Sequence, residues 1–212
     1  MIRHGESIAN KERRYATPDD KLTKKGITQA HAVAERMKSF TLDVIITSPQ
    51  LRAKDTATII SDTHACKQVV DNDLFIERAT PTALYGSPYQ DPAAIEIQRV
   101  LRENWVINPS KRHSDEENYY DVLSRVKRAV EFLEAHEADQ IAVISHNFFM
   151  TMLHGYLIAR EETTPALLYS SFFFHRQDNT GLTIYEYDTD DHPYAPNGWR
   201  LVTWNDQRHL GD

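Results

Sequence analysis

The chain has 212 residues, a formal net charge of −7 and a single cysteine. Hydrophobic residues make up 41% of it and charged residues 26%, which is the balance of a folded globular protein rather than a disordered one. The acidic balance without a basic run argues against nucleic-acid binding, one cysteine excludes an internal disulfide, and no apolar stretch is long enough for a membrane span.

These properties predict a single soluble domain over residues 1–212, since no repeat, low-complexity tract or linker divides the chain. The lone Cys66 suits a reducing compartment, so we expect a cytoplasmic protein. The oligomeric state is left open.

The first third of the chain alternates between helical and strand-like patterns. Apolar residues recur at helical spacing from 27 to 37, and Thr23 is placed to cap that helix. The apolar run 42–47 predicts a buried strand that a turn ends at Ser48-Pro49, and helical spacing resumes from 51 to about 60. A short β-prone piece follows at 68–70.

The rest of the chain predicts further helices, and near its C-terminus the spacing of apolar residues changes from helical to strand-like. Residues 80–92 hold three prolines and a glycine and predict a loop. Helices are expected over 94–105, from about 117 to 133 and over 148–159, with the strongest buried-strand signal at 140–145. Three late strands are predicted at 172–175, 182–187 and 199–204.

This order of elements predicts an α/β fold, a three-layer α/β/α sandwich with a mainly parallel central sheet. In such sheets ligands bind at the carboxyl ends of the strands. Polar side chains follow three of the predicted strands and should converge there: Arg3, His4, Arg52, His146 and Asn147.

Two arginines and two histidines at one edge predict a cationic pocket in an acidic protein, which suits phosphoryl transfer. The planar fork of arginine binds phosphate in a bidentate manner. An unprotonated His4 could attack phosphorus, and its neighbour Arg3 favours that neutral form. The leaving oxygen needs a proton, for which Glu77 is the best candidate, although an exposed glutamate paired with an arginine remains the alternative.

Several motifs in this order resemble the signatures of the histidine phosphatase superfamily, whose members are phosphoglycerate mutase-like in fold. They span nearly the whole chain: Arg3-His4-Gly5-Glu6-Ser7 with Asn10, Asp20 to Gly26 with Gln29-Ala30, Ser48 to Ala53 with Thr56-Ala57, Glu116 to Arg125, Ile144-Ser145-His146, Asn179 to Thr183, and Trp204-Asn205 to Leu210.

The resemblance implies a role for each matching residue. His4 would be phosphorylated during turnover, with Arg3, Asn10, Arg52 and His146 around the phosphoryl group. Glu77 would be the general acid and then the base that activates water. Asn147, at the position where the family usually has glycine, and Arg78, beside Glu77, are further candidates for substrate binding.

A substrate-covering insertion is expected at 78–115, where Tyr85 and Tyr89 could line the pocket. Tyr119 and Tyr120 could line it too, and an ordinary surface location is the alternative for all four tyrosines. The other histidines lack metal-ligand spacing, so no metal site and no cofactor are predicted. Only two residues precede Arg3, so either the first strand is very short or the native chain begins before Met1.

The resulting expectation is a histidine acid phosphatase-like enzyme, a metal-independent phosphomonoesterase that acts on a small phosphorylated metabolite and releases inorganic phosphate. A mutase of the phosphoglycerate type is the alternative. The resemblance favours hydrolysis, however, because mutases of that type are longer than this chain and have a different segment at the position that follows Glu77-Arg78 here. A non-catalytic binding domain that retains the fold and a phosphohistidine protein phosphatase also remain open.

Overall fold

Six strands form one mixed sheet in the computed structural model, which describes residues 1–66, 68–188 and 197–211. The strands are β1 (Ile2–Arg3), β2 (Val44–Thr47), β3 (Val69–Asp71), β4 (Ile141–Ser145), β5 (Leu182–Tyr187) and β6 (Trp199–Asp206). Their order across the sheet is β3-β2-β4-β1-β5-β6. The first four are parallel, whereas β5 is antiparallel to β1 and β6 to β5, so the predicted mainly parallel sheet is confirmed.

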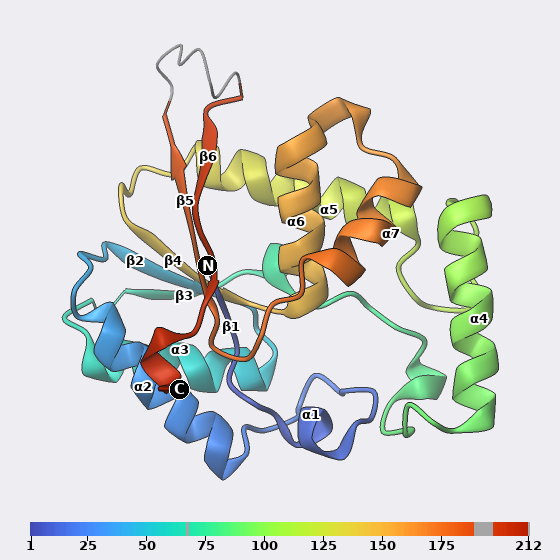
Figure 1. Cartoon of the computed structure of the whole chain (residues 1–212), viewed down its shortest axis with the longest axis horizontal. Helices are drawn as coiled ribbons and strands as arrows, with labels where there is room; N and C mark the ends of the chain where they lie inside the picture. The colour runs from blue at the N-terminus through green and yellow to red at the C-terminus, as the bar shows by residue number, and fades with distance from the viewer. Residues whose placement is uncertain (67, 189–196, 212) are drawn as a thin grey trace.

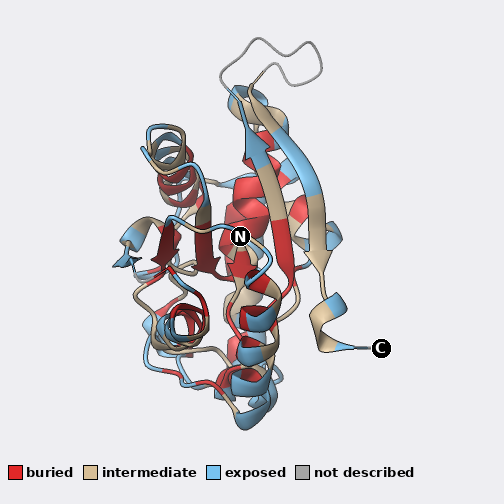
Figure 2. Ribbon diagram, turned by 90° about the vertical axis from the view of Figure 1, so that its left-hand side faces the viewer, coloured by how far each residue is buried: buried red, intermediate tan, exposed pale blue. Residues whose placement is uncertain are grey.

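Helices cover both faces of the sheet and complete the predicted three layers (Figure 1). Because side chains alternate along a strand, Ile45 packs with α2 (Lys24–Met37) and α3 (Leu51–Thr63), while Val44 and Ile46 face the opposite layer. That layer consists of α5 (Tyr119–Glu134), α6 (Asn147–Ala159) and α7 (Pro165–Phe174). Figure 2 shows the buried residues concentrated where the sheet meets these helices.

The start of α2 explains why glycines stand at two positions of the first motifs. Thr23 caps this helix as predicted, its Oγ accepting a hydrogen bond from the amide of Gly26 at 3.0 Å. A Cβ on Gly5 would lie 2.5 Å from the Gly26 carbonyl oxygen, and a Cβ on Gly26 would lie 2.1 Å from that of Glu6. The loop after β1 can therefore contact the start of α2 only with glycine at both places.

Helix α4 (Pro92–Ile107) lies to one side of the three layers, as Figure 1 shows. Its residues Ala94 and Leu101 pack with Leu84 in a small cluster, and its Trp105 joins the main core. The short elements are α1 (Ile8–Glu12) and the 3₁₀ turns η1 (Asp73–Phe75), η2 (Thr82–Leu84), η3 (Arg160–Glu162) and η4 (Arg208–Leu210). Among the described residues, none of the helices is long and apolar enough to cross a membrane.

One predicted strand is wrong, since residues 172–175 form the end of helix α7 and its C-cap. Thr164 caps this helix by accepting a hydrogen bond from the Leu167 amide at 3.2 Å, and Pro165 occupies its first turn. Three consecutive phenylalanines favour a strand by local propensity, but the cap and the packing of Leu168 against α6 stabilise the helix instead. The other predicted helices and strands are present, with ends shifted by a few residues.

Candidate active site

Three adjacent parallel strands bring the polar side chains to one edge of the sheet. Arg3 of β1 pairs with Ser145 of β4, and Thr47 of β2 pairs with Ile144 of β4. The pairing continues past the strand ends, because the amide of His4 donates to the Ser145 carbonyl oxygen at 3.0 Å. His4 and His146 consequently lie side by side, with ring centroids 5.1 Å apart.

The hydrogen bonds of His4 define its tautomer. Nδ1 lies 2.7 Å from the carbonyl oxygen of Gly5, and Nε2 lies 3.2 Å from Nε of Arg52. An arginine N–H can only donate, so Nε2 is the acceptor and Nδ1 carries the proton. Burial, followed by the charges of Arg52 and Arg3, holds the pKa of His4 well below its usual value. At neutral pH the ring is neutral, with a lone pair on Nε2.

Arg3 and Arg52 bring positive charge to this point without a carboxylate partner among the residues described. Arg3 donates from one terminal nitrogen to the Gln177 carbonyl oxygen at 2.7 Å, and its buried Nε has no partner. Arg52 donates to the Thr17 carbonyl oxygen at 3.0 Å. Burial lowers the pKa of Arg3 to about 10, so it remains charged at neutral pH. The two guanidinium groups attract an anion.

His146 lies behind this arrangement and is fully buried. Its Nε2 is 2.8 Å from Oγ of Ser48, which also accepts the amide of Gln50 at 3.3 Å, and its Nδ1 has no described partner. Burial, with Arg52 next in importance, lowers the pKa of His146 well below its usual value. The ring contacts His4 but is not part of the cavity wall.

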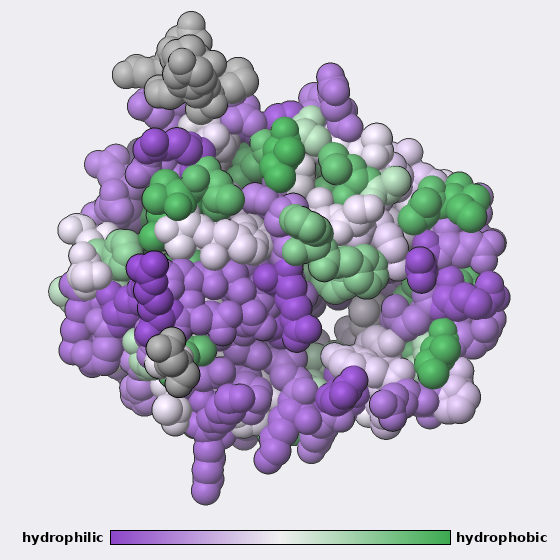
Figure 3. Space-filling view, in the orientation of Figure 1, coloured by the Kyte–Doolittle hydropathy of each residue, from purple (hydrophilic) through white to green (hydrophobic). Residues whose placement is uncertain are grey.

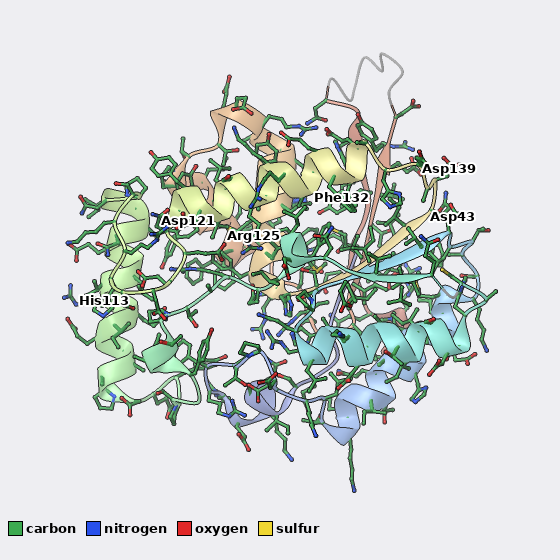
Figure 4. The ribbon with its side chains drawn as sticks, turned by 180° about the vertical axis from the view of Figure 1, so that it is seen from behind. Asp43, His113, Asp121, Arg125, Phe132 and Asp139 are labelled. Atoms are coloured by element: carbon green, nitrogen blue, oxygen red, sulfur yellow. The ribbon has the colours of Figure 1, made fainter. Side chains whose placement is uncertain are left out.

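Glu77 lies on the cavity wall at the N-terminus of α6. Its carboxylate accepts hydrogen bonds from the backbone amides of Phe149 at 3.2 Å, Phe148 at 3.3 Å and Arg78 at 3.0 Å. The preceding segment is held by Arg125 of α5, which donates to the carbonyl oxygen of Ile76 at 2.8 Å; Figure 4 shows Arg125 on its helix. The carboxylate is therefore fixed in orientation at the cavity.

Asn10 and Asn147 also line the cavity. The side-chain oxygen of Asn10 accepts the amide of Ser7 at 3.2 Å within the capping box of α1. The side-chain oxygen of Asn147 accepts the amide of Gln177 at 2.7 Å. In both cases the oxygen is engaged by the protein, which leaves the NH₂ group as the free donor.

The cavity has a volume of about 780 Å³ and extends from His4 to helices α4 and α7. Figure 3 shows the surface hollowed beside the α4 side of the molecule. Its outer wall is largely aromatic: Tyr15, Tyr85, Tyr89, Trp105, Phe148, Tyr169, Phe172 and Phe173. Of the four tyrosines considered from the sequence, Tyr85 and Tyr89 lie here, whereas Tyr119 is buried in the core and Tyr120 is exposed on the surface.

Arg78 lies on the cavity wall, toward its outer end. Its guanidinium carbon lies 4.9 Å from the ring centroid of Trp105 and 5.4 Å from that of Phe148. Its buried Nε has no partner, and no salt bridge to Arg78 occurs among the described residues. Three carboxylates act on Arg78 electrostatically, but each is hydrogen-bonded elsewhere: Glu117 pairs with Arg125 at 2.7 Å, Glu116 accepts the amide of Ser114 at 2.8 Å, and Glu77 accepts backbone amides of α6.

Sequence reasoning missed three residues that support the site. Ser48 contacts His146, Gln177 contacts Arg3, and Asn179 donates to the carbonyl oxygen of His4 at 2.9 Å. Ser48 and Asn179 lay within motifs that resemble the family, which was the available signal, whereas no sequence pattern pointed to Gln177. The described part of the chain holds no group of three or more metal-ligating side chains.

The fold and this arrangement agree with a comparison against protein families. The model of the histidine phosphatase superfamily (branch 1) matches residues 1–207, and the chain belongs to that superfamily. It is 28% identical over 217 residues to a protein of Enterobacter sp. (strain 638) named "Probable phosphoglycerate mutase GpmB", covering 99% of this chain and 93% of the relative.

Solved structures of the same fold include several phosphatases. YhfR of Bacillus stearothermophilus has a TM-score of 0.78 at 23% identity, covering 99% of this chain and 96% of its own. The alpha-ribazole phosphatase of Shigella flexneri has a TM-score of 0.76 at 21% identity, covering 97% and 95%. A phosphoserine phosphatase of Entamoeba histolytica, solved with 3-phosphoglyceric acid, has a TM-score of 0.73 at 21% identity, covering 99% and 96%. At these identities the likeness concerns the fold.

Proposed function

We propose that the protein is a metal-independent phosphomonoesterase that hydrolyses a small phosphorylated metabolite through a phosphohistidine on His4. The observation that carries the proposal is the state of that ring. It is neutral, its Nε2 lone pair lies at the inner end of a cavity, and it stands next to Arg3 and Arg52. A neutral imidazole between unpaired cations suits attack on a phosphate ester.

In the first half of the reaction the Nε–H of Arg52 turns from Nε2 of His4 to the phosphoryl oxygens of the substrate, which frees the lone pair of Nε2. Nε2 then forms a bond to phosphorus while the bond to the leaving oxygen breaks. Arg3, Arg52 and the NH₂ of Asn10 stabilise charge on the phosphoryl oxygens, and His146 supports this group from behind. Glu77, protonated at this stage, gives its proton to the leaving oxygen, and the alcohol departs. The enzyme is left with a phosphohistidine and a carboxylate.

In the second half a water molecule attacks phosphorus. Glu77 takes a proton from that water, the bond from phosphorus to Nε2 breaks, and inorganic phosphate leaves. His4 returns to its neutral form and Glu77 to its protonated form. Each step uses side chains of this protein and water, so the proposal requires no metal ion and no cofactor.

The outer end of the cavity supports a proposal about the leaving group. Segment 78–115 carries Arg78, Tyr85, Tyr89 and Trp105 to the wall, so we assign it the role of covering the substrate within a single domain of residues 1–212. Arg78 makes no salt bridge among the described residues, and its Nε has no hydrogen-bond partner there, so it would bind a second anionic or strongly polar group of the substrate. The aromatic rings would contact its carbon skeleton.

A phosphotransferase of the phosphoglycerate mutase type is the second candidate, favoured by the name of the Enterobacter relative. It would use the same phosphohistidine but return the phosphoryl group to a hydroxyl of the substrate. The two activities differ only in whether water or that hydroxyl reaches phosphorus, and neither the inner cavity nor its cations discriminate between them.

The test is phosphate release from a panel of phosphomonoesters in excess chelator, with His4→Ala beside the wild type. The panel includes 3-phosphoglycerate with and without its bisphosphate. We expect release that survives chelation and falls on the order of 10⁴-fold or more in His4→Ala, the scale on which removal of a nucleophile acts. Circular dichroism of the variant should be unchanged.

Other outcomes assign the protein differently. Isomerisation without release would favour the mutase, and activity only on phosphohistidine in proteins would favour a protein phosphatase. If the protein is folded but releases phosphate from no member of the panel and does not bind phosphate, an enzyme of this kind is contradicted and a binding domain is favoured. The expected cytoplasmic location and the oligomeric state remain to be measured by fractionation and by light scattering.

A further inference from the structure

The loop of residues 176–181, which precedes β5, lies directly behind the inner end of the cavity. Its backbone accepts a hydrogen bond from the guanidinium of Arg3 at the Gln177 carbonyl oxygen, and the amide of Thr180 donates to the Arg3 carbonyl oxygen at 2.9 Å. The same loop contacts Asn147 through the Gln177 amide. Residues distant in sequence thus support one side of the site.

Asn179 makes the most informative contacts of this loop. Its side-chain nitrogen lies 2.9 Å from the carbonyl oxygen of His4 and 3.2 Å from the side-chain oxygen of Asn10. A primary amide has two N–H donors, so a single group can make both bonds. Asn179 therefore connects the backbone of His4 to the side chain of Asn10.

These bonds determine which way the Asn10 amide points. Its oxygen accepts from the Ser7 backbone amide, which can only donate, and from Asn179. Both acceptor positions of the oxygen are then occupied, and the Asn10 NH₂ donates to no acceptor among the described residues. Since Asn10 lies on the cavity wall, its NH₂ is the group left for a ligand in the cavity.

We propose that Asn179, which does not itself line the cavity, is a positioning residue that orients the Asn10 amide as a donor toward the transferring phosphoryl group. The inference rests on the proposed function for the identity of the ligand. Without Asn179, the Asn10 oxygen retains one donor, and the side chain can rotate so that its oxygen faces the anion. The second hydrogen bond of Asn179 holds the carbonyl oxygen of His4.

A double-mutant cycle tests this coupling on kcat/KM. Asn179→Asp keeps the size of the side chain but removes both donors, and we expect a loss of roughly 10- to 100-fold, the range for a hydrogen bond to a charged group. In an Asn10→Ala background the same change should cost several-fold less than in the wild type, because only the lost contact with the His4 carbonyl oxygen and the added charge still act. Losses that multiply in the double variant would show that Asn179 does not act through Asn10 and would overturn the proposal.

Asn118→Asp is the matched control, because it adds the same charge at the N-cap of α5, where aspartate caps equally well. Its kcat/KM should equal that of the wild type. Asn179→Ala, checked by thermal unfolding, replaces Asn179→Asp where the latter fails to fold.

A second readout does not depend on turnover. The side-chain NMR signals of Asn10, identified by their absence in Asn10→Ala, should shift when inorganic phosphate is added to the wild type. In Asn179→Ala that shift should be strongly reduced. An equal shift in both proteins would overturn the positioning role even if the wild type hydrolyses no phosphomonoester. If the wild type does hydrolyse phosphomonoesters and the losses of the two variants multiply, the positioning role is contradicted but the proposed function is not.

Discussion

The two ends of the cavity are built in different ways. At the inner end, Arg3, His4 and His146 come directly from the ends of adjacent parallel strands, and each is buried or held by hydrogen bonds to the protein. At the outer end the wall comes from α4, α7 and the segment before α4, and the guanidinium of Arg78 lies against the rings of Trp105 and Phe148.

This difference assigns phosphoryl transfer to the inner end of the cavity and substrate specificity to the outer end. Groups fixed on the sheet edge keep one geometry and can serve any phosphate ester. Side chains on peripheral helices and loops adapt to the remainder of the molecule that carries the phosphate. We therefore expect inner substitutions to reduce turnover of every substrate to a similar degree, except where the leaving group matters, and outer substitutions to change the ranking of substrates.

After the loss of the nucleophile His4, the largest expected effect on turnover concerns Glu77. Glu77→Gln removes the proton donor, and we expect kcat on an alkyl phosphate to fall about 10²- to 10⁴-fold. On p-nitrophenyl phosphate the loss should be much smaller for the first half of the reaction, because an activated phenolate leaves without a proton. Burst kinetics of nitrophenol release measure that step.

Glu103→Gln is the control, since it makes the same change of charge on the exposed surface of α4 and should leave kcat unaltered. An equal loss of the first step on alkyl and aryl phosphates would contradict the general-acid role of Glu77.

The next effect concerns Arg52. Arg52→Lys keeps the charge but loses the planar group that contacts both His4 and the Thr17 carbonyl oxygen. We expect kcat/KM to fall about 10²-fold, the cost of removing one preorganised donor, with the same factor on every substrate of the panel. Arg128→Lys, an exposed residue of α5, should have no effect. A loss that varies strongly among substrates would place Arg52 with the outer end instead.

The same contrast explains how much of the protein could be predicted from its sequence. Buried runs such as 141–145 end at polar residues, and parallel strands must bring such ends together, so the inner end and the sheet followed from local patterns. The contact between Asn179 and His4 joins residues 175 positions apart, and no local pattern encodes it.

The outer end was harder for a related reason. Whether a residue of α4 or α7 faces the cavity depends on how those helices pack, and both carry apolar residues on more than one side. Phe173 lines the cavity and is also 65% exposed, while the run that contains it was mistaken for a strand. Arg78 was a candidate by its position beside Glu77, but its contacts with Trp105 and Phe148 come from tertiary packing alone.

A smaller and selective effect is expected from Arg78→Met. Methionine preserves the contact with the two rings but removes the charge. KM should rise about tenfold for 3-phosphoglycerate and stay unchanged for glycerol 3-phosphate, which has a hydroxymethyl group in place of the carboxylate. Steady-state kinetics on this pair, with Arg112→Met as the control outside the cavity, measure the difference. An equal rise for both substrates would contradict a second-anion role of Arg78.

The last prediction concerns stability rather than turnover and arises mainly from the inner end. Burial lowers the pKa of His4 and of His146 well below 6.5, and burial with the nearby His175 lowers the pKa of His154 to about 4. Below pH 6.5 the unfolded chain binds protons on these histidines that the folded protein does not bind. The free energy of unfolding therefore decreases as the pH falls from 6.5 toward the folded-state values.

Each such histidine contributes a slope of at most about 1.4 kcal/mol per pH unit in that window. In urea unfolding, the midpoint should decrease slightly between pH 7.5 and 6.5 and much more between pH 6.5 and 5.5. His154→Asn, which keeps a polar partner for Tyr185, should reduce the slope by one histidine's share while the part due to His4 and His146 remains. A midpoint that does not change between pH 6.5 and 5.5 would mean that these rings take up protons in the folded state, and a protonated His4 has no lone pair with which to attack phosphorus.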